Sequence, residues 1–507
     1  MSDDPVDLLV IGGGINGVGI ARDAAGRGLK VTLVEQSDLA AATSSASTKL
    51  VHGGLRYLES FEFRLVRESL LERERLLAIA PHLVRPMEFI LPHVPGLRPR
   101  WQIRLGLFFY DHIGIRQRLP ASRSLSLAGT QYGEPLREHI THGFAYADCA
   151  VDDSRLVVLN AMDAARRGAS IHTRTRFLSA EHSGDAWRAS CRSELTGARL
   201  RISARGIVNA GGPWVDRVLN ALPGVRNDAQ LRLVKGSHIV VPQLYSGEHA
   251  FLLQNSDGRV IFTIPYEGRF TLVGTTDVPC GSDPEEARIS AAELDYLCKS
   301  VNGYFRGRLT ANEVRWSYTG IRPLVDDEAA TASRVTRDYR LELSAEQPAL
   351  LSVFGGKLTT YRKLAEAALE KLQPIIGGSR YTWTDRAPLP GGDFQNGDFG
   401  AFLDAAKRRW RFLPDALAAR LARTYGTEME KILDGATELN DLGDHFGAGL
   451  TAAEVRHLTT REWAVTAEDI LWRRTKTGLH MTASEHALVE LYLGKRSEPR
   501  RSVRISD

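Results

Sequence analysis

The sequence predicts an α/β protein in three parts: a domain built on a buried parallel sheet, an inserted α+β cap built on an antiparallel sheet, and a helical C-terminal domain. Three patterns predict this architecture. A short apolar run, a glycine-rich turn and a helical stretch open the chain, which is typical of a strand in a parallel sheet. Strand-like runs separated by turn residues fill the middle of the chain, and apolar residues three and four apart dominate its end.

The glycine-rich turn lies in VDLLVIGGGINGVGIARDAAGRGLKVTLVEQ, residues 6–36. Gly12, Gly14 and Gly17 have the GxGxxG spacing. The first glycine of this motif makes a tight turn, the second lets a pyrophosphate approach the backbone, and the third lets the helix pack on the strand. The start of the helix offers N–H groups and a positive dipole to phosphates. Glu35 ends the next apolar run and can accept hydrogen bonds from ribose hydroxyls. The segment therefore predicts a Rossmann-like dinucleotide site and leaves NAD and FAD open.

Two later segments repeat the strand–glycine–helix pattern. ARGIVNAGGPWVDRVL, residues 204–219, is a strand that ends in the Asn-Ala-Gly-Gly of residues 209–212. PALLSVFGGKLTTYRKLAEAALEKL, residues 348–372, is a strand to Phe354, then a pair of glycines, then an amphipathic helix from about Thr359. In this order they resemble flavoproteins of the glycine and D-amino-acid oxidase type. The resemblance implies one FAD threaded between the N-terminal fold and the late glycine turn, which would lie near the isoalloxazine ring.

Longer motifs resemble a narrower family. The segments that carry the resemblance are IGGGINGVGIARDAAGRGL, DLAAATSSASTKLVHGGLRYLE, EFRLVRESLLERERLL, KGSHIVV, GTTDV, GIRPL, FGGKLTTYRKLAE and WRRTK. Together they resemble the FAD-dependent glycerol-3-phosphate dehydrogenases of aerobic respiration over essentially the whole chain. The resemblance implies oxidation of sn-glycerol 3-phosphate to dihydroxyacetone phosphate by hydride transfer to FAD, in glycerol metabolism. It also implies that a membrane quinone reoxidises the flavin.

Other functions are compatible with parts of this pattern. A glycerol-3-phosphate oxidase, which passes electrons to oxygen, would share the flavin and substrate motifs, so only the resemblance separates the two. A non-catalytic flavin-binding regulator has no need of Arg56, Arg322 and Lys357 together, yet all are present. Dedicated nucleic-acid binders are excluded by charge, because 65 basic and 61 acidic residues leave a net charge of only +4. We expect no nucleic-acid partner.

Cations beside glycine or proline turns are the candidates for binding a phosphorylated substrate. Arg56 lies in HGGLRY, Arg322 in GIRPL, Arg337 in VTRDY and Lys357 in FGGK. The planar guanidinium makes two parallel charge-assisted bonds to phosphate, although a surface ion pair is the alternative for each arginine. We assign the phosphate to Arg56, with Arg337 as a weaker helper. We assign the reacting end of the substrate to Arg322 and Lys357 and count both as catalytic.

Histidines are candidates for accepting the alcohol proton, because imidazole titrates near neutral pH. His52, in the HGGLRY segment, and His238, in the KGSHIVV segment, are the two catalytic candidates of this kind, with a structural role as the alternative for both. Tyr57, Thr275 and Asp277 are candidate hydrogen-bonding partners of the substrate. The sequence does not say which group accepts the proton.

The hydroxyl residues of the TSSAS segment can donate to the cofactor's pyrophosphate while letting the backbone come close, and a simple turn is the alternative. All residues that we expect to contact FAD lie in or beside glycine- or serine-rich turns, Glu35 excepted. They are Gly12, Gly13, Gly14, Ile15, Asn16, Gly17, Glu35, Thr43, Ser44, Ser45, His52, Gly53, Gly54, Ala210, Gly211, Gly212, Trp214, Gly355, Gly356, Lys357, Leu358 and Thr359.

The domains follow from where the composition changes. Residues 1–80, 146–226 and 331–387 are predicted to form a discontinuous FAD-binding domain, and residues 81–145 and 227–330 the substrate-binding cap. Within the cap, residues 249–277 read as an antiparallel meander. RAPLPGGDFQNGDFG, residues 386–400, is a linker by composition, and residues 388–507 are predicted to form the helical C-terminal domain.

Compartment and partners follow from charge and hydropathy. The acidic, polar start MSDDPVD predicts no signal peptide, and no window reaches about 18 apolar residues, so we expect a cytoplasmic protein without a membrane span. The four separated cysteines, without CxxC spacing, predict free thiols in a reducing compartment and no metal site. A homodimer is one oligomeric state that the sequence allows without selecting it.

Residues 98–119, RPRWQIRLGLFFYDHIGIRQRL, combine basic and aromatic side chains. The residues concerned are Arg98, Arg100, Arg104, Arg116, Arg118, Trp101, Phe108, Phe109 and Tyr110. This composition suits an anionic membrane surface, whereas a cap helix with a solvated basic face is the alternative. The implied quinone favours peripheral association with the cytoplasmic membrane.

Overall fold

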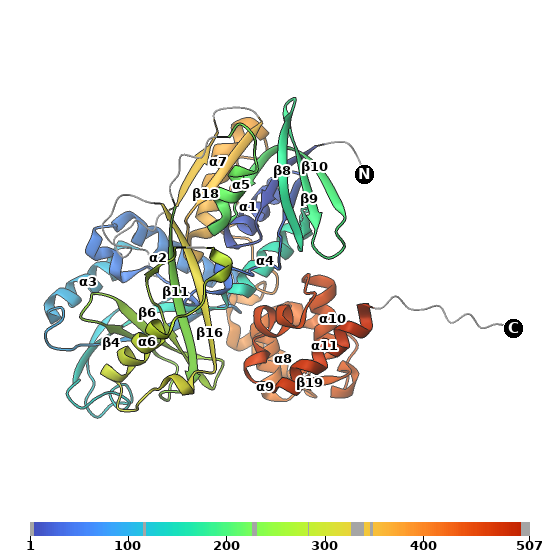
Figure 1. Cartoon of the computed structure of the whole chain (residues 1–507). Helices are drawn as coiled ribbons and strands as arrows, with labels where there is room; N and C mark the ends of the chain where they lie inside the picture. Colours follow the sequence, from blue (N-terminus) through green and yellow to red (C-terminus); the bar gives the residue numbers. More distant parts are fainter. Residues whose placement is uncertain are drawn as a thin grey trace. The chain divides into compact units, whose positions relative to one another are not determined.

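The computed structural model describes residues 5–114, 118–225, 231–281, 283–325, 339–344 and 348–497. The chain divides into two compact units, Met1–Leu389 and Pro390–Asp507. In Figure 1 the first unit runs from blue to light orange and the second from orange to red. The predicted linker, residues 386–400, contains the point of division.

A mainly parallel sheet in unit 1 is built from strands that span residues 6–354. Its parallel strands are β18 (Ala349–Phe354), β10 (Arg199–Asn209), β1 (Val6–Ile11), β2 (Val31–Val34) and β7 (Ser170–His172), in that spatial order. Antiparallel strands extend it: β17 (Arg340–Leu343) beside β18, and β9 (Ala186–Ser193) with β8 (Thr175–Ser183) beside β10. Val10 pairs with both Leu33 and Val208. The prediction of an α/β fold is therefore confirmed, and β1 and β2 have the predicted bounds.

Three helices pack together beside this sheet: α1 (Ile15–Gly26), α4 (Asp153–Arg166) and α7 (Tyr361–Ile376). Gly19 of α1 leaves no space for a side chain, because a Cβ would lie 2.7 Å from the ring of Tyr361. The Nε of Arg22 donates to Asp163 over 2.7 Å, which joins α1 to α4 within the buried interface. Close helix contact therefore fixes α1, and with it the glycine turn that precedes it.

A second sheet, which we call the cap sheet, also lies in unit 1. Its main order is β15 (Val278–Pro279), β11 (Leu231–Pro242), β14 (Phe270–Gly274), β13 (Val260–Tyr266), β12 (Ala250–Gln254), β4 (Val84–Pro92), β6 (His142–Val151) and β3 (Leu50–Val51). Its strands β3 and β6 extend beyond the predicted cap residues 81–145 and 227–330. β16 (Trp316–Val325) pairs with β11, and β5 (Arg123–Ser126) pairs with β6. The predicted meander is confirmed, because β12, β13 and β14 pair antiparallel in succession. The sheet is mixed, since β12 runs parallel to β4.

The two faces of the cap sheet have different partners. Ile239 and Val241 of β11 pack into a core with Leu297 and Val301 of α6 (Ala291–Tyr304), which covers one face. Because side chains alternate along a strand, His238, which directly precedes Ile239, lies on the opposite face. By register, Arg322 of β16 lies on the same face as His238. Helix α6 contacts β11 and β12 of this sheet, and Figure 1 shows it beside β11.

Unit 2 is mainly helical, as predicted. Its helices are α8 (Phe399–Arg409), α9 (Asp415–Tyr425), α10 (Ala452–Arg461), a π-helix (Asp469–Arg474) and α11 (Ala483–Ser497). They enclose a core that includes Leu421, Tyr425, Leu458 and Ile470. A two-stranded sheet of β19 (His445–Gly447) and β20 (Leu450–Thr451) was not predicted.

All four cysteines, Cys149, Cys191, Cys280 and Cys298, are free thiols, which confirms that prediction. Across the described ranges, no helix combines the length and the apolar character that a bilayer crossing requires.

Candidate active site

The turn between β1 and α1 is too tight for side chains. Gly12 has φ +112°, and a Cβ there would lie 2.4 Å from the carbonyl oxygen of Ala210. A Cβ on Gly17 would lie 2.0 Å from the carbonyl oxygen of Gly12. The first two glycine junctions of the sequence therefore meet backbone to backbone, because β1 and β10 are neighbours.

Polar groups converge on the start of α1, whose N-cap residue Gly14 has no side chain to cap the helix. The Ile15 N–H donates to Ser44 Oγ (2.9 Å), and the Gly13 N–H donates to Glu35 Oε2 (2.7 Å). Asn16 Nδ2 donates to the carbonyl of Gly355 (3.1 Å), and its buried Oδ1 has no hydrogen-bond partner among the described residues. Backbone N–H groups, a hydroxyl and a carboxylate gathered at a helix N-terminus fit the pyrophosphate and ribose of a dinucleotide.

Burial raises the pKa of the Glu35 carboxyl above its ordinary value, against the opposing hydrogen bonds from the N–H groups of Gly13 and Ser37. Thr43 lies in the short helix η1 (Thr43–Ser45) and donates its hydroxyl hydrogen to the carbonyl of Ile321 (2.7 Å). Thr43 thereby ties the serine-rich segment to β16. Ser45 accepts at its backbone carbonyl from Lys49 Nζ (3.0 Å).

The late glycine turn joins β18 to α7. Gly355 and Gly356 have φ +72° and +97°, and a Cβ on Gly356 would lie 2.8 Å from Asn16 Nδ2. The turn continues into the short helix η6 (Leu358–Thr360), where Thr359 Oγ1 accepts from the His52 N–H (3.3 Å). The turns at residues 12–17, 52–54 and 355–359 are therefore neighbours in the fold, although the sequence separates them widely.

The predicted cations also converge. Arg322 donates through Nη1 to Asp277, and through Nη2 to Thr275 Oγ1 at 3.1 Å. Arg56 Nη1 lies 4.0 Å from Asp277 Oδ2. Lys357 Nζ lies 3.8 Å from the ring centroid of Tyr57, a cation–π contact. Arg337 falls outside the described residues.

Two paired glycines, which we call the glycine floor, lie beside Arg322. Gly236 of β11 pairs with Gly320 of β16, on the face that carries His238 and Arg322. A Cβ on Gly236 would lie 2.5 Å from Arg322 Nη2, and a Cβ on Gly320 would lie 2.9 Å from the carbonyl oxygen of Ala46. The glycines of KGSH and GIRPL therefore make room for a guanidinium and for the serine-rich segment.

His238 is buried on the same face. Its Nε2 lies 3.0 Å from Thr48 Oγ1, its ring stacks on Tyr318 with 4.9 Å between centroids, and its Nδ1 has no hydrogen-bond partner among the described residues. Burial, with smaller contributions from the charges of Arg322 and Lys49, holds the pKa of His238 well below 6.5. The imidazole is therefore uncharged near neutral pH and has a nitrogen lone pair to accept a proton.

The contacts that hold the segment next to His238 in place were not predicted from the sequence. Lys49 Nζ forms a buried ion pair with Asp153 (2.8 Å), and Asp153 also accepts from the Ser47 hydroxyl (2.7 Å). Tyr318 donates its hydroxyl to the carbonyl of Ser47 (2.9 Å). A lysine inside the motif STKLVHGGLRY was the only signal in the sequence. Nothing in VDDSRL indicates that Asp153 is its partner.

Comparison with known proteins identifies the family. A family model described as FAD dependent oxidoreductase matches residues 7–362, and one described as the C-terminal domain of alpha-glycerophosphate oxidase matches residues 382–492. A glycerol-3-phosphate dehydrogenase of Pseudomonas aeruginosa is 54% identical over 489 residues, which cover 96% of this chain and 94% of that protein. The chain belongs to the FAD-dependent glycerol-3-phosphate dehydrogenase family.

Other proteins resemble this chain over nearly its whole length. The aerobic glycerol-3-phosphate dehydrogenase of Escherichia coli is 47% identical over 499 residues, covering 98% of this chain and 99% of that one. A D-erythritol 1-phosphate dehydrogenase of Brucella abortus is 50% identical over 482 residues, covering 95% and 96%. The solved glycerol-3-phosphate dehydrogenase of Bacillus halodurans, complexed with FAD, superimposes with a TM-score of 0.76 at 29% identity, covering 98% of this chain and 91% of that one. FAD is the cofactor of the present chain, and the residues around the start of α1 fit it.

Proposed function

We propose that this chain oxidises sn-glycerol 3-phosphate to dihydroxyacetone phosphate. Arg56 and Arg322 meet at Asp277, Lys357 lies against Tyr57 next to Arg56, and all three adjoin the turns that fit FAD; this grouping carries the proposal. A small phosphorylated alcohol needs a cation for its phosphate, a proton acceptor for its hydroxyl and a hydride acceptor beside its carbon. Bound FAD supplies the last of these by accepting the hydride.

The cations have different roles in this proposal. Arg56 is 28% exposed in its side chain and has only a loose contact with Asp277, so it is accessible to an incoming phosphate. Arg322 is held against Asp277 and Thr275, beside His238, and it stabilises charge that develops on the alcohol oxygen. Arg337, outside the described residues, is a further candidate for the phosphate.

His238 is the proposed acceptor of the alcohol proton. A dianionic phosphate held by Arg56, which contacts the same Asp277 as Arg322, would offset part of the positive charge that lowers the pKa of His238. Substrate binding therefore raises the basicity of the imidazole at the step that needs it. His52 remains a second candidate, placed against the late glycine turn by its backbone bond to Thr359.

Single-turnover reduction of the bound flavin under anaerobic conditions tests these roles. Removal of Arg56 takes away binding that ground and transition states share, so Arg56→Ala is expected mainly to raise the KM. Arg322→Ala is expected to slow flavin reduction by about thirty- to a thousand-fold, the effect of losing an electrostatic contact in a closed site. If both variants, with normal FAD content, reduce at the parent rate and with the parent's substrate dependence, the site assignment is wrong.

A second candidate substrate is D-erythritol 1-phosphate, since a 50% identical relative bears that name. Bleaching of the flavin with each phosphorylated polyol, at equal concentrations and without oxygen, compares the two. Faster bleaching by glycerol 3-phosphate supports the proposal, and faster bleaching by erythritol 1-phosphate replaces it with the second. No bleaching by either overturns both.

We propose a membrane quinone as the electron acceptor, in line with the family resemblance, and oxygen is the alternative. The reduced enzyme is mixed with a soluble quinone or with oxygen, and the return of flavin absorbance is followed. Rapid reoxidation by quinone with little peroxide is expected. Rapid peroxide formation instead would make the chain an oxidase.

Peripheral membrane association is proposed through one exposed surface. α3 (Arg100–Ile113) exposes Trp101, Leu105, Phe108 and Phe109 while burying three other side chains. Two further exposed aromatics, Phe61 and Phe63, follow η2 (Leu55–Ser60), which contacts α3. We call these six residues the α3 patch. Apolar side chains that protrude in this way suit insertion at a bilayer interface.

The arginines around the α3 patch contribute less than the sequence suggested. Arg98 pairs with Glu59 (2.5 Å), and Arg104 Nη1 donates to Ser122 (2.8 Å). Arg100 and Arg118 are exposed, and Arg116 lies outside the described residues. The proposed contact is therefore chiefly apolar, with an anionic bilayer adding a smaller electrostatic term.

A further inference from the structure

A buried network of charged and polar groups lies behind the turn at residues 52–54. Arg73 of α2 (Phe63–Ile79) forms an ion pair with Asp148 of β6 at 2.7 Å. Tyr110 of α3 donates its hydroxyl to the same carboxylate, at 2.7 and 2.8 Å from its two oxygens. All three side chains are almost completely buried. The carboxylate thus has a cation and a hydroxyl as partners, which a buried charge requires.

The network ends on the backbone of the turn. The Gly53 N–H donates to the Tyr110 hydroxyl (2.8 Å) and, more weakly, to Asp148 Oδ1 (3.3 Å). A Cβ on Gly53 would lie 2.4 Å from Leu70 and 2.6 Å from the Tyr110 hydroxyl. The turn is therefore pressed directly against the network, with no side chain between them.

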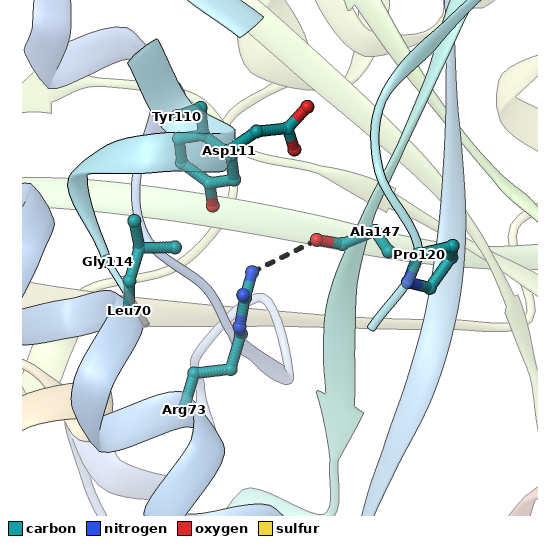
Figure 2. Close-up of a pocket in the computed structure, with 7 residues that line it drawn as sticks. All are labelled: Leu70, Arg73, Tyr110, Asp111, Gly114, Pro120 and Ala147. Carbon is teal, nitrogen blue, oxygen red and sulfur yellow. Dashed lines mark hydrogen bonds between the residues drawn. The ribbon is translucent and has the colours of Figure 1, made fainter. Parts of the chain in front are cut away.

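Figure 2 shows the geometry at this point. The hydroxyl of Tyr110 is directed toward Arg73, whose guanidinium donates to the carbonyl of Ala147 (3.0 Å). A cavity of about 10 Å³, lined by Leu70, Arg73 and Tyr110 among others, lies beside them and has room for about one water molecule. Because the side chains of Arg73, Asp148 and Tyr110 are almost completely buried, bulk water is kept from these bonds and a low local dielectric strengthens them.

The direction of the hydrogen bonds is fixed by protonation. Burial, with the nearby charge of Asp148, raises the pKa of Tyr110 well above 10. The phenol therefore keeps its hydrogen and donates it to Asp148, which leaves the phenolic oxygen to accept from Gly53. A chain of donors that ends in a carboxylate polarises each bond in it.

Residues of the proposed site lie immediately before and shortly after this turn in the sequence. His52, immediately before Gly53, bonds through its N–H to Thr359 in the late glycine turn. Gly54, immediately after, has φ +76° and begins the short helix that presents Arg56 and Tyr57. A shift of the turn moves both sets of groups at once.

We propose that Tyr110, held by Asp148 and Arg73, is a positioning residue that fixes the His52–Tyr57 segment in the geometry needed for flavin reduction. Tyr110 acts through the Gly53 backbone and has no direct contact with the reacting atoms. The inference rests on the proposed oxidation of a polyol phosphate. Misplacement of a positioned group by about 1 Å costs on the order of a hundred-fold in rate.

The test compares Tyr110→Phe with Tyr146→Phe. Tyr146 is also buried, contacts the ring of Tyr110 at 5.9 Å, and among the described residues makes no hydrogen bond to the turn. Stopped-flow flavin reduction at saturating glycerol 3-phosphate is expected to fall roughly ten- to a hundred-fold in Tyr110→Phe and less than about two-fold in Tyr146→Phe. FAD content and Tm are measured in both variants. Equal rates in Tyr110→Phe and the parent overturn the proposal.

A double-mutant cycle separates positioning from general destabilisation. Asp148→Asn and Tyr110→Phe are expected to slow flavin reduction together by less than the product of their separate effects, because they break one chain of bonds. Rates that multiply independently, or that follow Tm across all variants, contradict the proposal.

A readout without substrate keeps this inference distinct from the proposed function. Hydrogen–deuterium exchange of the peptide that contains residues 50–57 should be faster in Tyr110→Phe than in the parent, and unchanged in Tyr146→Phe. If the parent flavin is not bleached by any polyol phosphate, the proposed function fails while this comparison still decides whether Tyr110 holds the turn. Unchanged exchange in Tyr110→Phe overturns the positioning role.

Discussion

At the residue scale, Arg322 can lie where it does because Gly236 has no Cβ. A Cβ at this position meets Arg322 Nη2 at 2.5 Å and Thr275 Oγ1 at 2.8 Å, so Gly236→Ala must displace the guanidinium. Both atoms belong to side-chain ends that can move, so the stability cost should be about 1 kcal/mol. Flavin reduction should slow by about ten-fold or more, with FAD content unchanged.

Gly303→Ala is the matched control for Gly236→Ala. Gly303 is exposed in α6, and a Cβ there would have open space around it. Alanine is also the better helix former, so this variant should be as stable as the parent or slightly more stable. If Gly236→Ala reduces its flavin as fast as Gly303→Ala does, Arg322 is not where the reaction needs it.

The depressed pKa of His238 predicts a specific pH dependence. The folded protein keeps this imidazole neutral until the pH falls well below 6.5, so the acid limb of kcat/KM that belongs to His238 should lie below pH 6.5. The stability that the neutral imidazole contributes is present above pH 6.5 and is lost as the pH falls toward the folded pKa. His238→Asn should remove that limb and flatten the loss of Tm with acid. An identical limb in this variant would assign it to another group.

The sequence indicated candidate site residues that lie in recognisable motifs. It did not indicate which side chains from other parts of the chain contact them. Arg322 and Lys357 became candidates because each adjoins a glycine or proline turn in an apolar context, and His238 because imidazole titrates near neutral pH. Lys49 and Tyr110 lie within segments that the sequence analysis singled out, but their partners Asp153 and Asp148 come from other parts of the chain. Such buried pairs depend on tertiary contacts, which local patterns do not contain.

At the scale of elements, the two faces of α3 have different environments. Ile103, Leu107 and Tyr110 are buried, whereas Phe108 and Phe109 protrude. Phe108→Ser with Phe109→Ser should therefore weaken sedimentation with anionic vesicles by about ten-fold or more, since each removes a large apolar contact with the bilayer. The change should leave flavin reduction by glycerol 3-phosphate intact, because neither side chain reaches the candidate site.

Leu488→Ser with Leu491→Ser provides the control for the α3 patch. Both leucines are exposed on α11 of unit 2, with exposed fractions of 48% and 55%. This control should bind vesicles as the parent does. Equal binding by the α3 double variant and the parent would refute the proposed membrane contact.

Elements were predicted well where periodicity and turn chemistry agree. The continuous apolar runs Val6–Ile11 and Val31–Val34 became β1 and β2 with unchanged bounds. The β19–β20 pair was missed because its strands have three and two residues, too few for alternation to appear. Parallel pairing of β12 with β4 was also beyond the sequence, since it joins segments that no local turn connects.

At the scale of the whole molecule, the groups that fit FAD extend from the turn after β1 to the turn after β18. Added FAD should therefore raise the Tm of the FAD-stripped protein, by an amount equivalent to about 2.7 kcal/mol at a hundred times the Kd. FMN, which lacks the adenosine that Glu35 is expected to contact, should raise the Tm much less. A scanning fluorimetry titration measures both, and equal shifts with the two flavins would contradict the assignment of the α1 turn.

The order of strands in the parallel sheet constrains how the protein is made. During synthesis β1 has no parallel partner on one side until Val208 has been added, and β10 has none on its other edge until Leu351 follows. Pairing between such distant segments is slow, and the open strand edges of a partly made chain favour aggregation. The late glycine turn comes after β18. The nascent chain therefore lacks part of the site that fits FAD until about seven-tenths of its residues have left the ribosome. Cofactor supply and chaperone access at that late stage should therefore govern the yield of active protein.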